Sequence, residues 1–183
     1  MTRTRLAVVA VLAAGGIAAG LLLSGGHSDP AVAHVGGEKI TRDELGATVD
    51  HFRQEAKNEG TPFPDENSAR FRSLRNHLLG VLVYRAELAQ AARRLGLRVT
   101  NIQVLRRMNP NSGGEESTTD RFQYETVKTQ LLYERIYANV TRGISSPTTA
   151  ELTARKNAAM KRYISRLERE TQVRYEPGYA PGP

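Results

Sequence analysis

Paired acidic residues and histidines could carry chemistry in this sequence, and neither is arranged as a catalytic site. Asp43 and Glu44 are adjacent carboxylates that could serve as general acid and base. They fall, however, in the first turn of an expected helix, where acidic side chains favour the helix dipole. The histidines have no i, i+4 partner of the kind that builds a helical metal site. They are His27, His34, His51 and His77. The sequence therefore predicts no catalytic residue and no metal site.

Other common catalytic patterns are also missing from the sequence. Gly36 and Gly37 are not followed by the Lys-Ser/Thr pair of a phosphate-binding loop, and no serine sits in a nucleophile elbow. The chain has no cysteine, which excludes disulfides, thiol nucleophiles and thiolate metal ligands. We expect a protein that is not an enzyme and that binds no cofactor.

The charge pattern indicates a solvated surface rather than a nucleic-acid site. The chain carries 26 Lys and Arg against 19 Asp and Glu, a net charge of +7. Arginines recur at helical spacing, for example at Arg70, Arg72 and Arg75, but acidic residues interleave with such groups along the chain. Together with the export signal described next, this predicts no nucleic-acid partner. Contact with an anionic membrane surface or wall polymer stays open.

The N-terminal segment predicts export. Residues Leu6 to Leu23 are uncharged, and their length spans about 27 Å as a helix, close to the hydrocarbon core. Arg3 and Arg5 precede this run, so the positive-inside rule places the remainder outside the cytoplasm. The run is longer than the apolar region of a typical signal peptide. We therefore expect residues 1–26 to form a single-pass signal-anchor helix in the cell membrane. The alternative is a cleaved signal and a secreted protein.

A small sheet is expected at the two ends of the exported part, which follows a linker over 27–30. Residues 31–35 and 38–40 flank Gly36-Gly37 and predict a tight hairpin. Residues 172–176 alternate like a strand, and because a hairpin is not stable by itself, we expect this strand to join it. Residues 177–183 (PGYAPGP) are expected to be a disordered tail.

Apolar periodicity predicts amphipathic helices between these strands, over about 41–59, 68–95, 100–108, 120–142 and 148–171. Three of them open with the spacing of a capping box, at Thr41/Glu44, Thr100/Gln103 and Thr148/Glu151. The longest has an apolar stripe of Phe71, Leu74, Leu78, Leu82, Ala86 and Ala89. Additional apolar residues beside that stripe predict contacts on two sides. The expected fold is mainly α, with helices packed around a small N-terminal hairpin that a C-terminal strand completes.

The order of these parts resembles the N-terminal domain of the SurA/PrsA family of extracytoplasmic chaperones and foldases. The matching segments are VAHVGGEKITRDEL (32–45), LLGVLVYRAELAQAARRLGL (78–97), VTNIQV (99–104) and ISSPTTAEL (144–152). Many members of the family carry a parvulin-type prolyl isomerase domain after the last of these segments. Here the sequence continues through one helix, from Thr148 to Thr171, with no room for it. The resemblance thus implies the chaperone half, over 31–176, without the isomerase half.

The expected function is that of a membrane-anchored, extracytoplasmic, chaperone-like domain that binds unfolded or exported polypeptides. Such a protein needs apolar surface rimmed by charge rather than catalytic residues. The candidate client-binding residues are Val81, Val83 and Tyr84, outside the main stripe of the longest helix, and Phe63 in the connector before it. Two alternatives stay open: a foldase of the prolyl isomerase family whose activity is lost or supplied by a partner, and a structural adaptor of a cell-envelope complex.

Overall fold

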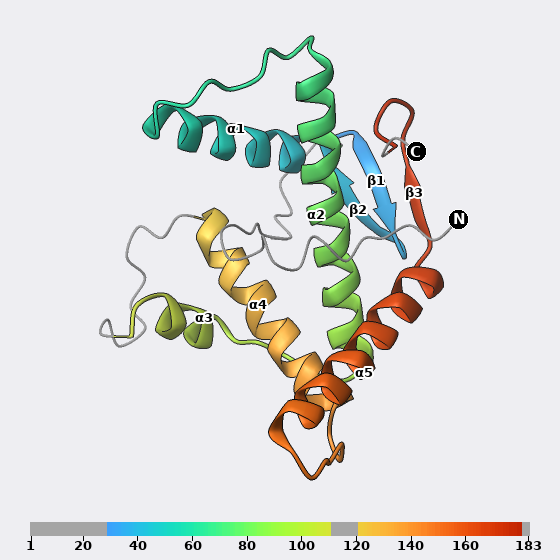
Figure 1. Cartoon of the computed structure of the whole chain (residues 1–183). Helices are drawn as coiled ribbons and strands as arrows, with labels where there is room; N and C mark the ends of the chain where they lie inside the picture. The colour runs from blue at the N-terminus through green and yellow to red at the C-terminus, as the bar shows by residue number, and fades with distance from the viewer. Residues whose placement is uncertain (1–28, 111–120, 181–183) are drawn as a thin grey trace. The chain divides into compact units, whose positions relative to one another are not determined.

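A computed structural model describes residues 29–110 and 121–180 (Figure 1). The predicted signal-anchor over 1–26 lies outside the described residues. In the described ranges, no helix is both long enough and apolar enough to cross a membrane. The described residues form two compact units, a larger one of 29–98 with 132–180 and a smaller one of 99–110 with 121–131.

A three-stranded antiparallel sheet joins the two ends of the larger unit. Strands β1 (Ala31–Val35), β2 (Glu38–Thr41) and β3 (Val173–Tyr175) lie in the order β2-β1-β3. The β1–β2 turn places Gly36 and Gly37 at φ 51° and 90°, the left-handed region that favours glycine. The predicted hairpin and the predicted addition of the C-terminal strand are both confirmed.

The register of β3 is fixed along its whole length. Val173 lies opposite Val35, and Tyr175 lies opposite Ala33. Backbone hydrogen bonds continue past both ends of the strand. The Gly36 N–H donates to the Gln172 carbonyl at 2.9 Å, and the Glu176 N–H donates to the Val32 carbonyl at 3.0 Å. The chain therefore closes on itself, because its last strand pairs with its first.

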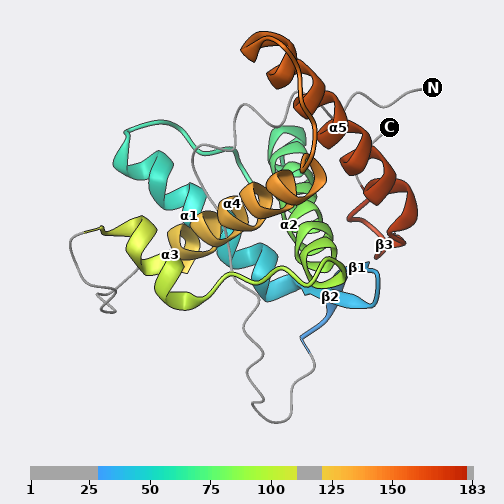
Figure 2. The ribbon, with the colours of Figure 1, turned by 90° about the horizontal axis from the view of Figure 1, so that it is seen from below.

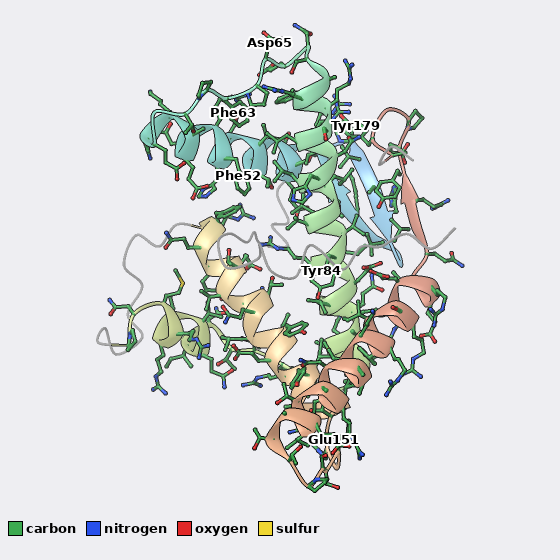
Figure 3. All side chains as sticks on the ribbon, in the orientation of Figure 1. Phe52, Phe63, Asp65, Tyr84, Glu151 and Tyr179 are labelled. Carbon is green, nitrogen blue, oxygen red and sulfur yellow. The ribbon has the colours of Figure 1, made fainter. Side chains whose placement is uncertain are left out.

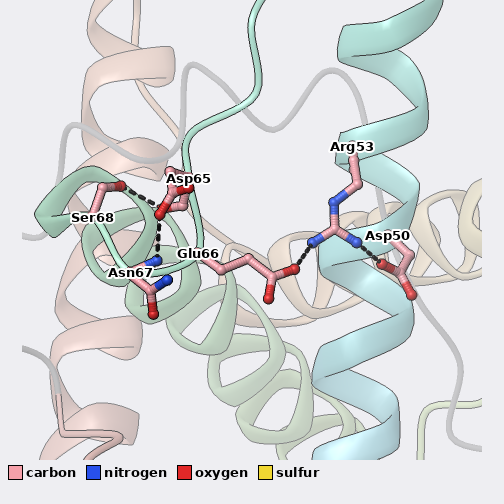
Figure 4. Close-up of polar contacts among 6 residues, drawn as sticks. All are labelled: Asp50, Arg53, Asp65, Glu66, Asn67 and Ser68. Atoms are coloured by element: carbon pink, nitrogen blue, oxygen red, sulfur yellow. Dashed lines mark hydrogen bonds and ion pairs between the residues drawn. The ribbon is translucent and has the colours of Figure 1, made fainter.

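Side-chain caps start the two helices that follow the hairpin. The Glu44 N–H donates to Thr41 Oγ1 at 3.1 Å where α1 (Arg42–Asn58) begins. The Phe71 N–H donates to Ser68 Oγ at 3.0 Å where α2 (Ala69–Arg94) begins. Asp65 orders the turn before α2, since it accepts hydrogen bonds from the Asn67 N–H and the Ser68 hydroxyl (Figure 4). These caps satisfy backbone donors that the first helical turn leaves free.

The core of the larger unit has two parts. In the first, α1 and α2 pack against the hairpin (Figure 1). Its buried residues are Val32, Val35, Ile40, Leu45, Val49, Leu78, Leu79, Leu82 and Val83.

In the second part, the C-terminal half of α2 packs with the second half of α4 (Arg121–Val140) and with α5 (Thr149–Glu170), which Figure 2 shows from below. Its buried residues are Leu88, Ala91, Ala92, Ile136, Met160 and Leu167. The expectation that the longest helix makes contacts on two sides is confirmed.

The end of the chain differs from the predicted disordered tail. Residues 177–180 form a turn in which the Tyr179 N–H donates to the Glu176 carbonyl at 3.1 Å. Arg75 and Asn76 of α2 donate side-chain hydrogen bonds to the carbonyls of Gly178 and Ala180. The prediction of a disordered tail is wrong for these residues, because contacts with a distant helix order a segment that is too polar to fold locally. Residues 181–183 lie outside the described part.

The smaller unit contains α3 (Asn101–Met108) and the first half of α4. Gln103 Oε1 accepts a hydrogen bond from the Thr100 N–H at 3.0 Å, as expected from the capping-box spacing. The Tyr124 hydroxyl donates to Asn101 Oδ1 at 2.8 Å and so links α4 to α3. Val104 and Phe122 are buried, whereas Ile102 is 45% exposed.

Candidate client-binding surface

Three of the four predicted client-binding residues lie on α2, but they differ in exposure. Val81 and Tyr84 are half-buried. Val83 is only 2% exposed and belongs to the buried core. A side chain buried to this degree presents no surface to a client in this conformation, so the surface proposed below omits Val83.

Phe63, the fourth predicted residue, is half-buried in the connector between α1 and α2. Its ring meets the Phe71 ring edge-on, with 6.3 Å between centroids, and the Arg53 guanidinium lies 5.2 Å from its centre. Arg53 is itself held by Asp50 at 2.5 Å and by Glu66 at 2.7 Å (Figure 4). These contacts give Phe63 a structural role in fixing the connector to both helices.

The structure does not bring the predicted residues into one site. Phe63 packs on Phe71, whereas Tyr84 lies 13 positions further along α2, which is about 20 Å at 1.5 Å per residue. Figure 3 shows the two labelled side chains at separate levels of the helix. Phe63 and Tyr84 would therefore serve separate surfaces.

Tyr84 belongs to a group of tyrosines that the sequence analysis did not single out. Tyr84, Tyr133, Tyr137 and Tyr163, from α2, α4 and α5, are half-buried and pack against the core cluster that contains Ile136 and Leu167. We call these four residues the tyrosine surface. The i, i+4 spacing of Tyr133 and Tyr137 was the available signal in the sequence.

Contacts among these residues give the tyrosine surface a defined geometry. The rings of Tyr133 and Tyr137 stack with 6.4 Å between centroids and 28° between planes. The Tyr137 hydroxyl donates to Asn157 Oδ1 at 3.0 Å. The Arg166 guanidinium lies 5.7 Å from the centre of the Tyr163 ring. Polar or charged groups thus lie beside two of the rings, those of Tyr137 and Tyr163.

Burial raises the pKa of three of these phenols, those of Tyr84, Tyr133 and Tyr163. It raises the pKa of Tyr84 well above the ordinary value of 10, and the nearby Tyr133, Glu168 and Glu87 raise the pKa further. Burial also raises the pKa of Tyr133, with a further contribution from Tyr137. For Tyr163, burial raises the pKa although Arg166 and Arg94 lower it. Because even an ordinary phenol ionises only near pH 10, the surface offers uncharged rings with hydroxyl donors at neutral pH.

A polar cavity of about 420 Å³ lies at the β1–β2 turn, beside the C-terminal ends of α2 and α5. Arg94, Arg174, Glu170 and His34 are among its lining residues, so charges of both signs face it. Across residues 29–110 and 121–180, no group of His, Asp and Glu is placed to hold a metal ion.

Comparison of the sequence with known protein families identifies the family of this chain. The chain matches the SurA-like N-terminal domain over residues 3–139, more than half of its length, and it belongs to this family. No curated protein matches the chain. The family domain is the chaperone-type, non-catalytic part of SurA-like proteins, so membership indicates a chaperone-like role in general.

Proposed function

We propose that this protein is a membrane-anchored, extracytoplasmic chaperone-like domain that binds unfolded exported polypeptides and catalyses no reaction on them. The observation that supports this most strongly is the tyrosine surface. Four half-buried aromatic rings from three helices lie on one core cluster. Together with family membership, this surface favours polypeptide binding over catalysis.

Tyrosines suit a binding surface that must accept many sequences. A tyrosine ring offers a large apolar contact at a low cost in side-chain entropy, and its hydroxyl satisfies a polar neighbour. Tyrosine phenols are neutral at pH 7, so no phenolate repels an apolar client. Arg166 at the rim adds a charge that can pair with acidic residues of a client.

The proposed location follows from the N-terminal sequence. The uncharged run from Leu6 to Leu23 is long enough for a membrane span, and Arg3 and Arg5 favour a cytoplasmic N-terminus. A binding domain tethered in this way would meet exported chains as they leave the membrane. Protease added to intact cells should then digest residues 29–183, and protection of these residues would contradict the proposed sidedness.

Suppression of aggregation tests the binding function. Residues 29–183 should reduce light scattering when a chemically denatured model protein is diluted into buffer. Tyr163→Ser removes one ring of the tyrosine surface and should weaken this suppression several-fold, because it deletes apolar contact area at the proposed site.

Tyr124→Ser is the matched control. Tyr124 is also a half-buried tyrosine, but it lies in the first half of α4 and outside the tyrosine surface. Melting temperatures of both variants establish that each is folded. Equal suppression by the two variants would contradict the proposed site, and no suppression by the parent protein would contradict the proposed function.

A further inference from the structure

The last described residues of the chain lie on α2 in the way that a bound peptide would. Arg75 Nη2 donates to the Gly178 carbonyl at 2.7 Å, and Asn76 Nδ2 donates to the Ala180 carbonyl at 3.3 Å. The Arg75 guanidinium also stacks on the ring of Tyr179, 4.8 Å from its centre. Figure 3 shows Tyr179 beside the N-terminal half of α2. These contacts recognise two backbone carbonyls and one aromatic ring, which many peptides could supply.

Arg75 and Asn76 keep further capacity for hydrogen bonds. Within the described structure, Arg75 Nε and Asn76 Oδ1 are buried and have no hydrogen-bond partner. One is a donor and the other an acceptor, which is the complement of a peptide group. A buried polar atom without a partner costs free energy, so a ligand that satisfies both atoms gains affinity. The short tail leaves this capacity unused.

We propose that Arg75 and Asn76 form a peptide-binding site on α2, and that residues 177–180 of the same chain occupy it and compete with peptides from outside. The external ligand is an extended peptide with a tyrosine flanked by small residues, the chemistry of the tail itself. This site is separate from the tyrosine surface, and its test does not depend on aggregation assays.

Tethering determines how strongly the tail competes. Tyr179 is only four positions after the end of β3, and such a short link gives an effective concentration on the order of 1 mM. If a free peptide with the same contacts binds with a Kd of about 0.1 mM, the tethered tail weakens its apparent affinity about tenfold. Only a polypeptide that binds more tightly than the tail, or at several points, would displace it.

Fluorescence anisotropy with a labelled peptide tests the proposal. The probe is the synthetic octapeptide EPGYAPGP, which reproduces residues 176–183. The proteins are the full chain, purified in mild detergent, and a variant that ends at Glu176 and so keeps β3. The shortened variant should bind the probe saturably and about tenfold more tightly than the full chain.

Substitutions on α2 then locate the site. In the shortened variant, Arg75→Gln should abolish most of the binding, because it removes the cation and its hydrogen bonds. Arg72→Gln is the control, since Arg72 is exposed and donates to the Asn67 carbonyl at 3.2 Å instead of to the tail. Equal binding by the Arg75 and Arg72 variants would overturn the proposed site.

A second variant controls for a folding defect in the shortened chain. Tyr179→Ala keeps the full length of the tail but removes the ring that stacks on Arg75, so it should raise the affinity of the full chain for the probe. If neither the shortened chain nor the Tyr179 variant binds more tightly than the parent, the tail does not occupy a peptide site and the proposal fails.

Discussion

Two truncations of the C-terminus separate the contribution of β3 from that of the tail. Removal of residues 172–183 deletes β3 and both backbone hydrogen bonds that flank it, those of Gln172 and Glu176. Each such bond contributes about 1 kcal/mol net, and the half-buried Val173 and Tyr175 add about 1 kcal/mol each through apolar contact. Since this truncation also removes the tail contacts, worth about 1–2 kcal/mol, the expected loss is about 5–6 kcal/mol, a large share of a typical total of roughly 5–15 kcal/mol.

Removal of residues 177–183 deletes only the tail contacts with α2. The stacking of Arg75 on Tyr179 is worth about 0.5–1 kcal/mol at a partly exposed site. The hydrogen bonds to Gly178 and Ala180 add about 1 kcal/mol together, because both are exposed to water. The expected loss is therefore about 1–2 kcal/mol, which is smaller than the loss from deleting β3. A disordered tail would instead predict no loss of stability.

Thermal melts of residues 29–183 and of the two truncations measure the difference. At about 2–4 °C per kcal/mol for a chain of this size, the melting temperature should fall by roughly 10–24 °C without residues 172–183, and by roughly 2–8 °C without residues 177–183. Equal melting temperatures for the two truncations would refute the role of β3. An unchanged melting temperature for the shorter deletion would refute the docking of the tail.

Four substitutions test other parts of the fold. Gly80→Ala should raise the free energy of unfolding by about 0.5–1 kcal/mol in urea titrations, because Gly80 lies within α2 and an added Cβ meets no atom within 4 Å; an unchanged or lower stability would contradict this. Gly36→Ala should lower the free energy of unfolding by about 1–3 kcal/mol, since φ is +51° and the added Cβ would lie 2.3 Å from Oε1 of Gln90. Gly37→Ala should lower it less, because no atom lies near the added Cβ. Equal losses of stability in the two variants would exclude the clash with Gln90. Tyr84→Phe should make the loss of stability above pH 10 shallower. Because the pKa of Tyr84 is raised, the folded state keeps the phenol proton at a pH where the unfolded chain loses it. The contribution of the neutral phenol to the free energy of unfolding is therefore complete below pH 10, and above pH 10 it falls by up to about 1.4 kcal/mol per pH unit. The same slope in both proteins between pH 10 and pH 12 would show that Tyr84 does not titrate as the structure implies.

Local signals in the sequence predicted most of the secondary structure. Gly36-Gly37 predicted the hairpin because only a tight turn with positive φ suits two glycines between short alternating strands. The threonines at positions 41 and 148 predicted helix starts, and their hydroxyls accept hydrogen bonds from Glu44 and Glu151. The last strand could be predicted from topology, since a hairpin needs a third partner.

Burial along α2 could not be predicted from polarity. Glu87 is 3% exposed and Gln90 is 7% exposed, although both residue types favour water. Helices and strands pack around most of this part of α2, so its buried residues extend beyond the apolar stripe. Gln90 is satisfied by a hydrogen bond from Nε2 to the Val35 carbonyl, a contact between residues 55 positions apart.

The candidate site could be predicted only in part, because its residues come from three different helices. Tyr84 was identified because it lies beside the apolar stripe, but its neighbours Tyr133 and Tyr163 come from α4 and α5. Their grouping depends on how three helices pack, which periodicity within one helix does not reveal. The sequence did not predict that residues 177–180 are ordered, because Arg75 and Tyr179 are distant in the sequence and come into contact only in the folded chain.

Photo-crosslinking in intact cells tests the central claim, binding of varied polypeptides at the tyrosine surface, most directly. A photoreactive phenylalanine analogue replaces Tyr163 in one strain and Tyr124 in another, and crosslinked products are identified by mass spectrometry. The account predicts many different exported polypeptides crosslinked at position 163 and few at position 124. A single dominant partner at position 163, or the same products at both positions, would contradict a chaperone-like binding surface, and the single partner would instead favour a structural adaptor.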